Sequence, residues 1–256
     1  MRDVVLRSPA HPVCGFLGTI VARQEREAHE SSGAARHGEG SRGTILECGA
    51  GGMVPPLAIF RRSGFRCVGI DNDPEQLERA REFCSQHSID IDLRECDMRE
   101  LPFEDASFDY VYEHYSMCHL SKRDTATAIN EMRRVLKPGG LCFLGVISTD
   151  TWPLSPMGEE REPGERWDRD GEGMHSLFTD DEALALVSDW DILAREKAVR
   201  YMGRMASRMS FDTWMELHDE APETVSADDW HAGYETRAKL ICYVHEYFTL
   251  EKAASP

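Results

Sequence analysis

Apolar and polar positions follow a regular rhythm between Thr44 and Ile147. Short apolar runs alternate there with longer mixed segments, and the connections between them are short. The apolar runs predict buried strands at residues 44–48, 67–71, 89–94, 108–113 and 141–147. Strands that alternate with helices in this way predict a parallel sheet with helices on both faces.

The residues at the ends of the mixed segments predict three helices, at residues 55–63, 74–86 and 121–136. Asp73 and Pro74 are typical of a capped helix start, because the Asp side chain accepts orphan N–H groups and Pro suits the first turn. We expect the turn Lys137-Pro138-Gly139-Gly140 to stop the last of these helices.

After Ile147 the rhythm breaks. Residues 148–174 are acidic and rich in Gly and Pro, so we expect an irregular insert there, of the kind that often carries function. A capping box at Thr179 predicts a short helix to about residue 188. The remaining predictions are strands at 190–199 and 239–250 and a second, helical insert at 203–233.

The segment before this domain has a different composition. Residues 31–43 are small and polar with four glycines, which indicates a flexible linker between a separate N-terminal segment and the main domain. The apolar stretch 12–22 follows two arginines, as a secretory signal would. Prolines and an acid interrupt that pattern, so a short helix is the preferred interpretation. The predicted organisation is a helix and linker over 1–43, followed by one domain over 44–256.

Composition narrows the class of protein. Hydrophobic residues make up 41% and charged residues 29% of the 256 positions, as in a globular protein. The formal net charge of -17 repels phosphate backbones and argues against a nucleic-acid partner. No run approaches the ~18 apolar residues of a membrane span. The eight cysteines form no C-x-x-C pair, which indicates reduced thiols and a cytoplasmic protein.

A glycine-rich turn and an acidic residue carry the candidate chemistry. The turn Gly49-Ala50-Gly51-Gly52 follows the first predicted strand, and Asp71 ends the second, 20 positions after Gly51. Glycines let a ligand approach the backbone, and a carboxylate at the end of the next strand can accept from a ribose hydroxyl pair. A ribose-containing cofactor is therefore expected at this edge of the sheet.

The details favour one kind of cofactor over another. A dinucleotide fingerprint needs a third glycine, but Val54 stands in its place. Glu47 adds a carboxylate that would repel a pyrophosphate. A cofactor with an amino group or a positive centre fits better.

Several ordered motifs resemble those of class I S-adenosylmethionine-dependent methyltransferases, in particular the small-molecule, ubiquinone-biosynthesis-like group. The matching segments are Glu47–Gly52, Asp71, Glu95–Met98, Leu101–Val111, Arg134–Gly140 and His175–Thr179. The resemblance implies a doubly wound α/β fold with a mostly parallel seven-stranded sheet and an antiparallel last strand. The inserts would then follow strands five and six, and S-adenosyl-L-methionine would be the cofactor.

The same resemblance assigns roles to the turn and to the end of the second strand. Gly49, Ala50 and Gly51 would line the methionine end of the cofactor. Asp71 would hold the ribose hydroxyls, with Asn72 beside the adenine.

Further roles fall on the ends of the third and fourth strands. Asp97 would accept from the adenine amino group, and the Met98 N–H would reach the adenine ring. Glu47 is expected near the cofactor. Glu113 would face the methionine moiety or the substrate, although the family usually has a small or neutral residue there.

The candidate catalytic residues are Glu113, His119 and His175. Imidazole can accept a proton near neutral pH, and both histidines fall near the expected cleft. The spacing of His114 and His119 does not match a zinc site, so no metal is expected. A solvated or purely structural position remains the alternative for each histidine.

The resemblance implies in-line transfer of a methyl group to a nucleophilic atom of a small molecule. Trp and Met residues in the two inserts suit an apolar or aromatic acceptor. The chain has neither the Asn/Asp-Pro-Pro-aromatic motif nor the Pro-Cys pair of nucleic-acid methyltransferases. A protein methyltransferase, a catalytically silent cofactor-binding module and a nucleotide-dependent oxidoreductase remain as alternatives. The sequence predicts no oligomeric state.

Overall fold

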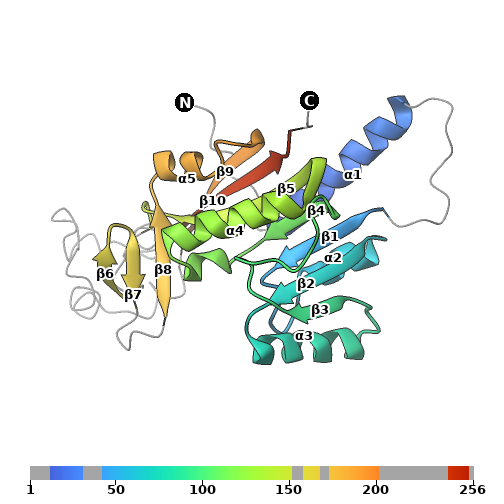
Figure 1. Cartoon of the computed structure of the whole chain (residues 1–256), viewed down its shortest axis with the longest axis horizontal. Coiled ribbons are helices and arrows are strands. Elements are labelled where there is room, and N and C mark those ends of the chain that lie inside the picture. The colour runs from blue at the N-terminus through green and yellow to red at the C-terminus, as the bar shows by residue number, and fades with distance from the viewer. Residues whose placement is uncertain (1–11, 31–41, 152–157, 168–172, 202–241, 254–256) are drawn as a thin grey trace, which may run out of the picture.

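Five parallel strands form the centre of the computed structural model, which describes residues 12–30, 42–151, 158–167, 173–201 and 242–253 (Figure 1). They are β1 (Thr44–Cys48), β2 (Arg66–Asp71), β3 (Asp92–Glu95), β4 (Phe108–Glu113) and β5 (Leu136–Ser148). Their order in the sheet is β3-β2-β1-β4-β5, so the direction of winding reverses between β1 and β4. Ligands bind at such a switch point in doubly wound sheets.

Two later strands extend this sheet. β10 (Cys242–Glu251) lies antiparallel to β5 and also pairs antiparallel with β9 (Asp191–Tyr201). The predicted fold class, a doubly wound and mostly parallel sheet with an antiparallel last strand, is therefore confirmed.

The insert after β5 contains strands that the sequence did not predict. β6 (Glu159–Glu162), β7 (Glu165–Trp167) and β8 (Met174–Phe178) form an antiparallel ribbon. β8 also pairs in parallel with the last residues of β5, which raises the sheet to ten strands within the described residues. Gly164 makes the tight turn of the ribbon with φ +74°, a conformation that favours glycine. The second predicted insert, 203–233, lies outside the described residues.

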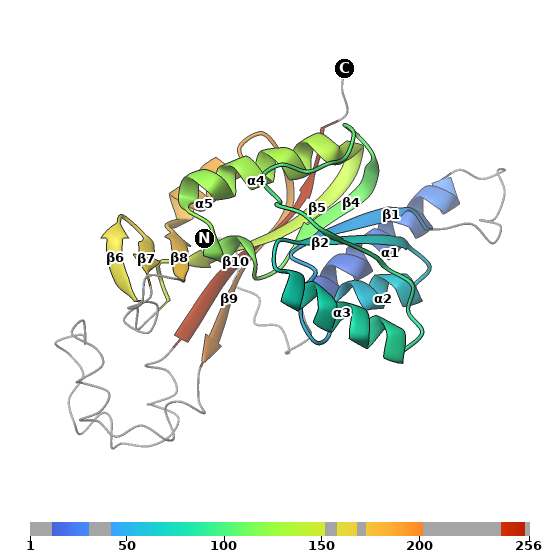
Figure 2. The ribbon, with the colours of Figure 1, turned by 60° about the horizontal axis from the view of Figure 1, so that its bottom comes forward.

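Helices cover both faces of the sheet (Figure 2). α4 (Lys122–Val135) and α5 (Asp180–Leu186) lie on one face. α1 (Pro12–Glu30), α2 (Leu57–Arg62) and α3 (Pro74–Gln86) lie on the other. The predicted caps are present: Asp73 accepts from the N–H groups of Glu75 and Gln76, and Thr179 forms a capping box with Glu182. A short 3-10 helix, η1 (Met117–His119), follows β4.

One sequence-based boundary needs correction. The Lys137–Gly140 segment was expected to be a turn before the fifth strand, but β5 begins at Leu136 and includes it. The sheet accommodates it through an irregular register against β4 and through Gly139, whose φ is +74°. His175 lies within β8, which ends just before α5, so this segment precedes a helix as predicted.

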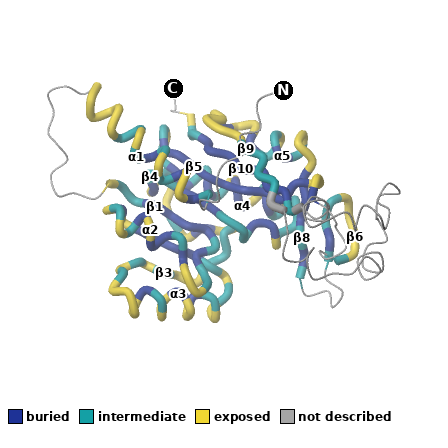
Figure 3. The backbone as a smooth tube through the Cα atoms, turned by 180° about the vertical axis from the view of Figure 1, so that it is seen from behind, coloured by how far each residue is buried: buried dark blue, intermediate teal, exposed yellow. Residues whose placement is uncertain are grey.

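α1 packs onto the sheet and is not separate from it. Its buried residues Val13, Phe16 and Ile20 join a hydrophobic cluster with α2 and with strands β1, β4, β5 and β10. The Phe16 ring stacks on Phe143 at 5.5 Å. Figure 3 shows the buried strands inside, with the far half of α1 and the outer side of α3 exposed. The linker residues 31–41 lie outside the described part of the chain.

Among the described residues, no helix combines the length and apolarity that crossing a bilayer requires.

Candidate active site

The carboxyl ends of β1, β2 and β4 place the predicted glycine turn, Asp71 and Glu113 along one edge of the sheet. Asp71 contacts the turn directly, since the Gly51 N–H donates to its Oδ2 at 2.9 Å. Its Oδ1 accepts from the Asp73 N–H at 3.0 Å. The Asp71 carbonyl accepts from the Cys96 N–H at 2.9 Å, which ties the segment of Asp97 to the same edge. Asn72 is exposed beside Asp71.

Gly49 and Gly51 leave no room for side chains. A Cβ on Gly51 would lie 2.6 Å from Asp71 Oδ2 and 2.5 Å from Gln76 Cβ. A Cβ on Gly49 would lie 1.8 Å from Ser116 Oγ, and Gly49 has φ +87°. The strip is thus a bare backbone between Asp71 on one side and Ser116 on the other. The absence of a Cβ at Gly49 and Gly51 therefore lets these neighbouring side chains pack directly against the main chain of the turn.

The amides of the turn are held in place by neighbouring elements. The N–H groups of Gly49 and Ala50 both donate to the Ile70 carbonyl at 2.8 Å, and the Gly52 N–H donates to the Gln76 carbonyl. Ala50 is buried, with its Cβ filling the space over Gly69. These contacts fix the turn against β2 and the start of α3.

Glu47 lies beneath the turn and points toward α2. It is 1% exposed, and its Oε2 accepts from the Leu57 N–H at 3.2 Å, at the first residue of that helix. Burial raises the pKa of Glu47 to about 8, and the Tyr112 hydroxyl beside it only partly offsets this rise. Glu47 is therefore mostly a neutral acid at pH 7.

Glu113 is fully buried at the end of β4 and organises the turn that follows. Its Oε1 accepts from the N–H groups of Ser116 and Met117. Burial raises the pKa of Glu113 to about 7, against the opposing effect of these backbone donors. The turn forces Tyr115 into the left-handed region with φ +70°, where a bulky residue is rarely found.

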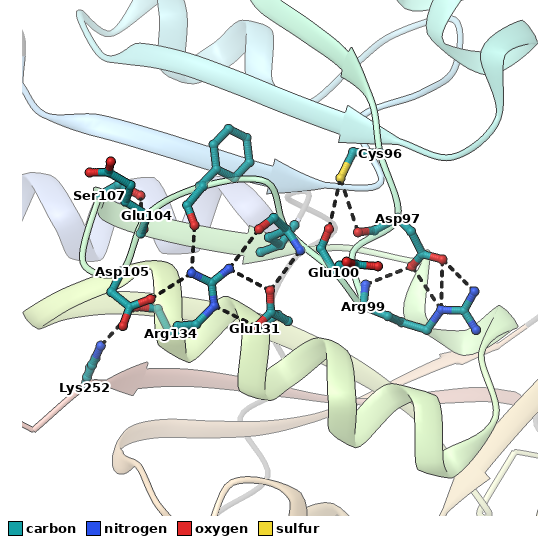
Figure 4. Close-up of polar contacts among 12 residues, drawn as sticks. Cys96, Asp97, Arg99, Glu100, Glu104, Asp105, Ser107, Glu131, Arg134 and Lys252 are labelled. Atoms are coloured by element: carbon teal, nitrogen blue, oxygen red, sulfur yellow. Dashed lines mark hydrogen bonds and ion pairs between the residues drawn. The ribbon is translucent and has the colours of Figure 1, made fainter.

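Asp97 and Met98 lie on the turn after β3. Met98 is half-buried and packs against the core cluster of α4. Asp97 is half-exposed and is gripped by Arg99, whose Nε and Nη2 reach both carboxylate oxygens (Figure 4). This ion pair lowers the pKa of Asp97, so the carboxylate is fully ionised at neutral pH.

The structure brings the two candidate histidines together. The His119 ring, on η1, lies 4.9 Å from the His175 ring on β8. His119 Nδ1 contacts the Met174 carbonyl at 3.1 Å. No group of three or more metal-ligating side chains is found in the described ranges.

Sequence reasoning assigned no role to three residues of this edge, which are Ser116, Arg99 and His245. Ser116 fills the space over Gly49, and Arg99 holds Asp97. Tyr115 packs edge-to-face on the His245 ring at 4.5 Å, and on the His114 ring at 4.2 Å. His245 comes from β10, more than a hundred residues away in sequence, so no local pattern could associate it with β4.

The doubly wound sheet, with the glycine strip at its switch point and the acid at the end of β2, is a Rossmann-like fold. Residues 46–144 match a family model described as "Methyltransferase domain". This part of the chain is thus similar to methyltransferase domains, in agreement with the resemblance that the motifs indicated.

Individual relatives agree with this result. The sterol 24-C-methyltransferase of Eremothecium gossypii is 30% identical over 177 residues, which cover 66% of this chain and 45% of the relative. The 27-O-demethylrifamycin SV methyltransferase of Amycolatopsis mediterranei is 31% identical over 143 residues, covering 55% and 50%. The chain therefore spans about half the length of these relatives.

A solved structure shares the fold. A putative methyltransferase from Bacillus halodurans superposes with a TM-score of 0.58 at 16% identity, covering 83% of this chain and 93% of that one. These comparisons favour the methyltransferase interpretation over the oxidoreductase alternative.

Proposed function

We propose that this protein is an enzyme that transfers a methyl group from S-adenosyl-L-methionine to a nucleophilic atom of a small, apolar or aromatic molecule. The observation that carries the proposal is the bare glycine strip held against Asp71. An ionised carboxylate has about four acceptor positions, so Asp71 can keep its two amide contacts and still accept from ribose hydroxyls. The bound cofactor supplies a methyl group already activated by its sulfonium.

The remaining cofactor contacts follow from the same edge. Gly49, Ala50 and Gly51 would line the methionine end, and Asn72 would lie beside the adenine. Asp97 and the Met98 N–H would recognise the adenine itself. Glu47, buried under the turn, would fix the turn and α2 relative to each other.

The acceptor would lie beyond the end of β4, between the Glu113 turn and the ribbon of β6, β7 and β8. Glu113 would act by holding this turn in place. His119 and His175 are the candidates for contact with the acceptor, and either imidazole can remove a proton from a hydroxyl acceptor. The similarity to a sterol methyltransferase and to a rifamycin methyltransferase supports a bulky, largely apolar small molecule.

We extend the proposal to location and partners. The seven cysteines whose side chains are described are free thiols, which suits the reducing cytoplasm. The net charge of -17 supports a small-molecule partner over a nucleic acid.

Calorimetric titration tests the cofactor. S-adenosylmethionine, S-adenosylhomocysteine and NADH are titrated into the wild-type protein, Asp71→Ala and the control Asp73→Asn, which can retain the helix cap. We expect micromolar binding of the first two ligands, weakened at least about tenfold by Asp71→Ala and little changed by Asp73→Asn. No binding of either, or binding of NADH instead, would refute the proposal.

Transfer is tested separately, with methyl-labelled cofactor and a panel of sterols, quinols, polyketide phenols and peptides. Label on a small molecule supports the proposed activity. Label on peptides alone would indicate a protein methyltransferase. Tight cofactor binding with no transfer to any acceptor would indicate a silent binding module.

A further inference from the structure

Arg99 grips the Asp97 carboxylate with three N–H groups. The Arg99 backbone N–H and Nε donate to Oδ1 at 2.8 and 3.0 Å, while Nε and Nη2 donate to Oδ2 at 3.0 and 2.6 Å. Figure 4 shows the Arg99 guanidinium directed at the Asp97 carboxylate, with dashed lines that reach both of its oxygens. These four contacts use only three hydrogens, because the Nε–H is shared between the two oxygens, and a carboxylate with about four acceptor positions can accept one hydrogen more. The remaining position belongs to a carboxylate whose orientation is already fixed.

The other side of Arg99 is anchored to the fold. Its Nη1 donates to Asp124 Oδ2 at 3.0 Å, in the first turn of α4. Farther along the same loop, Arg134 of α4 donates to the carbonyls of Leu101 and Phe103. Hydrogen bonds thus hold the loop from Asp97 to Phe103 against α4 at both of its ends. Arg99 makes the contact at the end next to Asp97.

Stability alone does not account for this arrangement. The Arg99 and Asp97 side chains are 40% and 37% exposed, and ion pairs at such positions contribute little to the free energy of unfolding. A half-exposed Asp on a turn would otherwise rotate among several rotamers. The measurable effect of the grip is the fixed direction of one carboxylate.

We propose that Arg99 is a positioning residue for adenine recognition: it holds Asp97 so that the one remaining acceptor position receives the amino group of the cofactor's adenine. This inference rests on the proposed function, because it deepens the adenine contact of the same site. The chemistry recognised is an exocyclic amino group, so Arg99 sets the preference for an adenosyl over a deaminated, inosyl ligand.

The chain offers a matched control for this pair. Arg94 binds the Asp92 carboxylate with the same two-residue spacing. Its Nη2 lies 2.6 Å from Asp92 Oδ2, and its Nε lies 3.1 Å from each of the two carboxylate oxygens. The Arg94 and Asp92 side chains are about as exposed as those of Arg99 and Asp97. They lie on β3, before the loop from Asp97 to Phe103. Arg94→Ala therefore removes an equivalent ion pair without touching Asp97.

The experiment measures Kd for S-adenosylhomocysteine and S-inosylhomocysteine by calorimetry. The proteins are the wild type, Arg99→Ala, Arg99→Lys, Asp97→Asn, the double variant Arg99→Ala/Asp97→Asn, and Arg94→Ala. We expect Arg99→Ala to weaken the adenosyl ligand about tenfold and the inosyl ligand less than about twofold. Arg99→Lys, which keeps the charge but not the planar fork, should fall between.

The double variant decides whether Arg99 acts through Asp97. If it does, Arg99→Ala changes the Kd of Asp97→Asn by less than about twofold. Melting temperatures of Arg99→Ala and Arg94→Ala should both stay within about 3 °C of the wild type.

Three results would overturn the proposal. An adenosyl Kd for Arg99→Ala that matches Arg94→Ala would remove any role in binding. Equal losses for both ligands, or an undiminished loss in the Asp97→Asn background, would indicate a structural role only. Failure of the wild type to bind S-adenosylhomocysteine would refute the proposed function itself. This outcome is distinct from the other three, because the wild-type titration alone shows it.

Discussion

Two buried carboxyl groups, Glu47 and Glu113, lie at the carboxyl ends of β1 and β4, beside the proposed cofactor site. Both are at most 1% exposed, and burial raises the pKa of Glu47 to about 8 and that of Glu113 to about 7. Neutral carboxyls cost less to bury than carboxylates, so the folded state retains protons that the unfolded chain releases. Both groups thereby make the free energy of unfolding depend on pH.

The raised pKa of Glu47 determines whether stability rises or falls with pH. Between the ordinary value of 4.5 and about 8, the folded state binds more protons than the unfolded chain, so stability falls as pH rises through this window. Gln stays neutral at every pH. We therefore predict that Glu47→Gln reduces the pH-dependent loss of free energy of unfolding by a few kcal/mol, on the order of 1.4 kcal/mol for each pH unit of the pKa shift. Urea unfolding at pH 5, 6.5 and 8 measures it, with exposed Glu30→Gln as the control. Parallel pH profiles for wild type and Glu47→Gln would contradict the prediction.

Gly49 has a positive φ, and the side chain of Ser116 occupies the position that its Cβ would take. The cost of backbone strain and the cost of the steric clash can be measured separately. Gly139 has a similar φ of +74° but nothing within 4 Å of its missing Cβ. We predict that Gly139→Ala costs about 1 kcal/mol from strain, and Gly49→Ala at least about 1–3 kcal/mol more, because of the clash with Ser116. Chemical denaturation compares the two variants, and Ser116→Gly in the Gly49→Ala background should recover part of the loss. Equal losses at both glycines would show that Ser116 yields without cost.

At the scale of elements, α1 is a structural part of the sheet's covering layer. Phe16 is 1% exposed and contacts the rings of Phe60, Tyr112 and Phe143. Arg23 of the same helix pairs with Glu251 at the end of β10, at 2.8 Å. The helix thus covers the face opposite α4 and closes over the aromatic cluster.

Truncation of Phe16 measures how much α1 contributes. We predict that Phe16→Ala lowers the free energy of unfolding by roughly 3–5 kcal/mol, because a large buried ring leaves a cavity. Exposed Glu25→Ala, on the same helix, should stay within about 0.5 kcal/mol of the wild type. Urea denaturation compares them. A small loss for Phe16→Ala would mean that the cluster stays packed without this ring.

The central elements could be predicted because their signals are local. The runs that became β1, β2, β4 and the core of β5 are apolar, and the Asp73 and Thr179 caps are readable in a few residues. The ribbon of β6 and β7 could not be predicted, since Glu159–Glu162 is uniformly polar and becomes a strand only by pairing with β7. β5 begins five residues earlier than expected because tertiary pairing extends it through a segment that favours a turn.

The candidate site also contains residues that the sequence predicted and contacts that it could not predict. Gly49, Gly51 and Asp71 stand out in sequence because chemistry requires those residue types after strands, and their proximity follows from parallel topology. The contact of Ser116 with Gly49 and the grip of Arg99 on Asp97 depend on turn and rotamer geometry, which no periodicity encodes. The predicted roles of these residues in binding and catalysis remain predictions.

At the scale of the whole molecule, the proposed cofactor site lies where several elements meet, so a bound ligand should stabilise the entire fold. Ligand at about 100 times its Kd adds roughly 2.7 kcal/mol to the free energy of unfolding. We predict a rise of roughly 5–10 °C in melting temperature with S-adenosylhomocysteine at that excess. Differential scanning fluorimetry measures the rise, which should shrink in Asp71→Ala at the same ligand concentration. A wild-type melting curve unmoved by the ligand would contradict both this prediction and the proposed site.

The docking of α1 also constrains how the protein is made. Phe16 stacks on Phe143, Phe143 stacks on Tyr247, and Arg23 reaches Glu251, so a helix near the start of the chain shares one cluster with its last strand. A ribosome adding about 5–20 residues per second needs roughly ten to fifty seconds to pass from Phe16 to Tyr247. During that interval the apolar side of the emerging helix has no completed surface to cover. The nascent chain can therefore form the contacts of Phe16 with Phe60, Tyr112 and Phe143 first, and it completes the cluster only when Tyr247 and Glu251 have emerged.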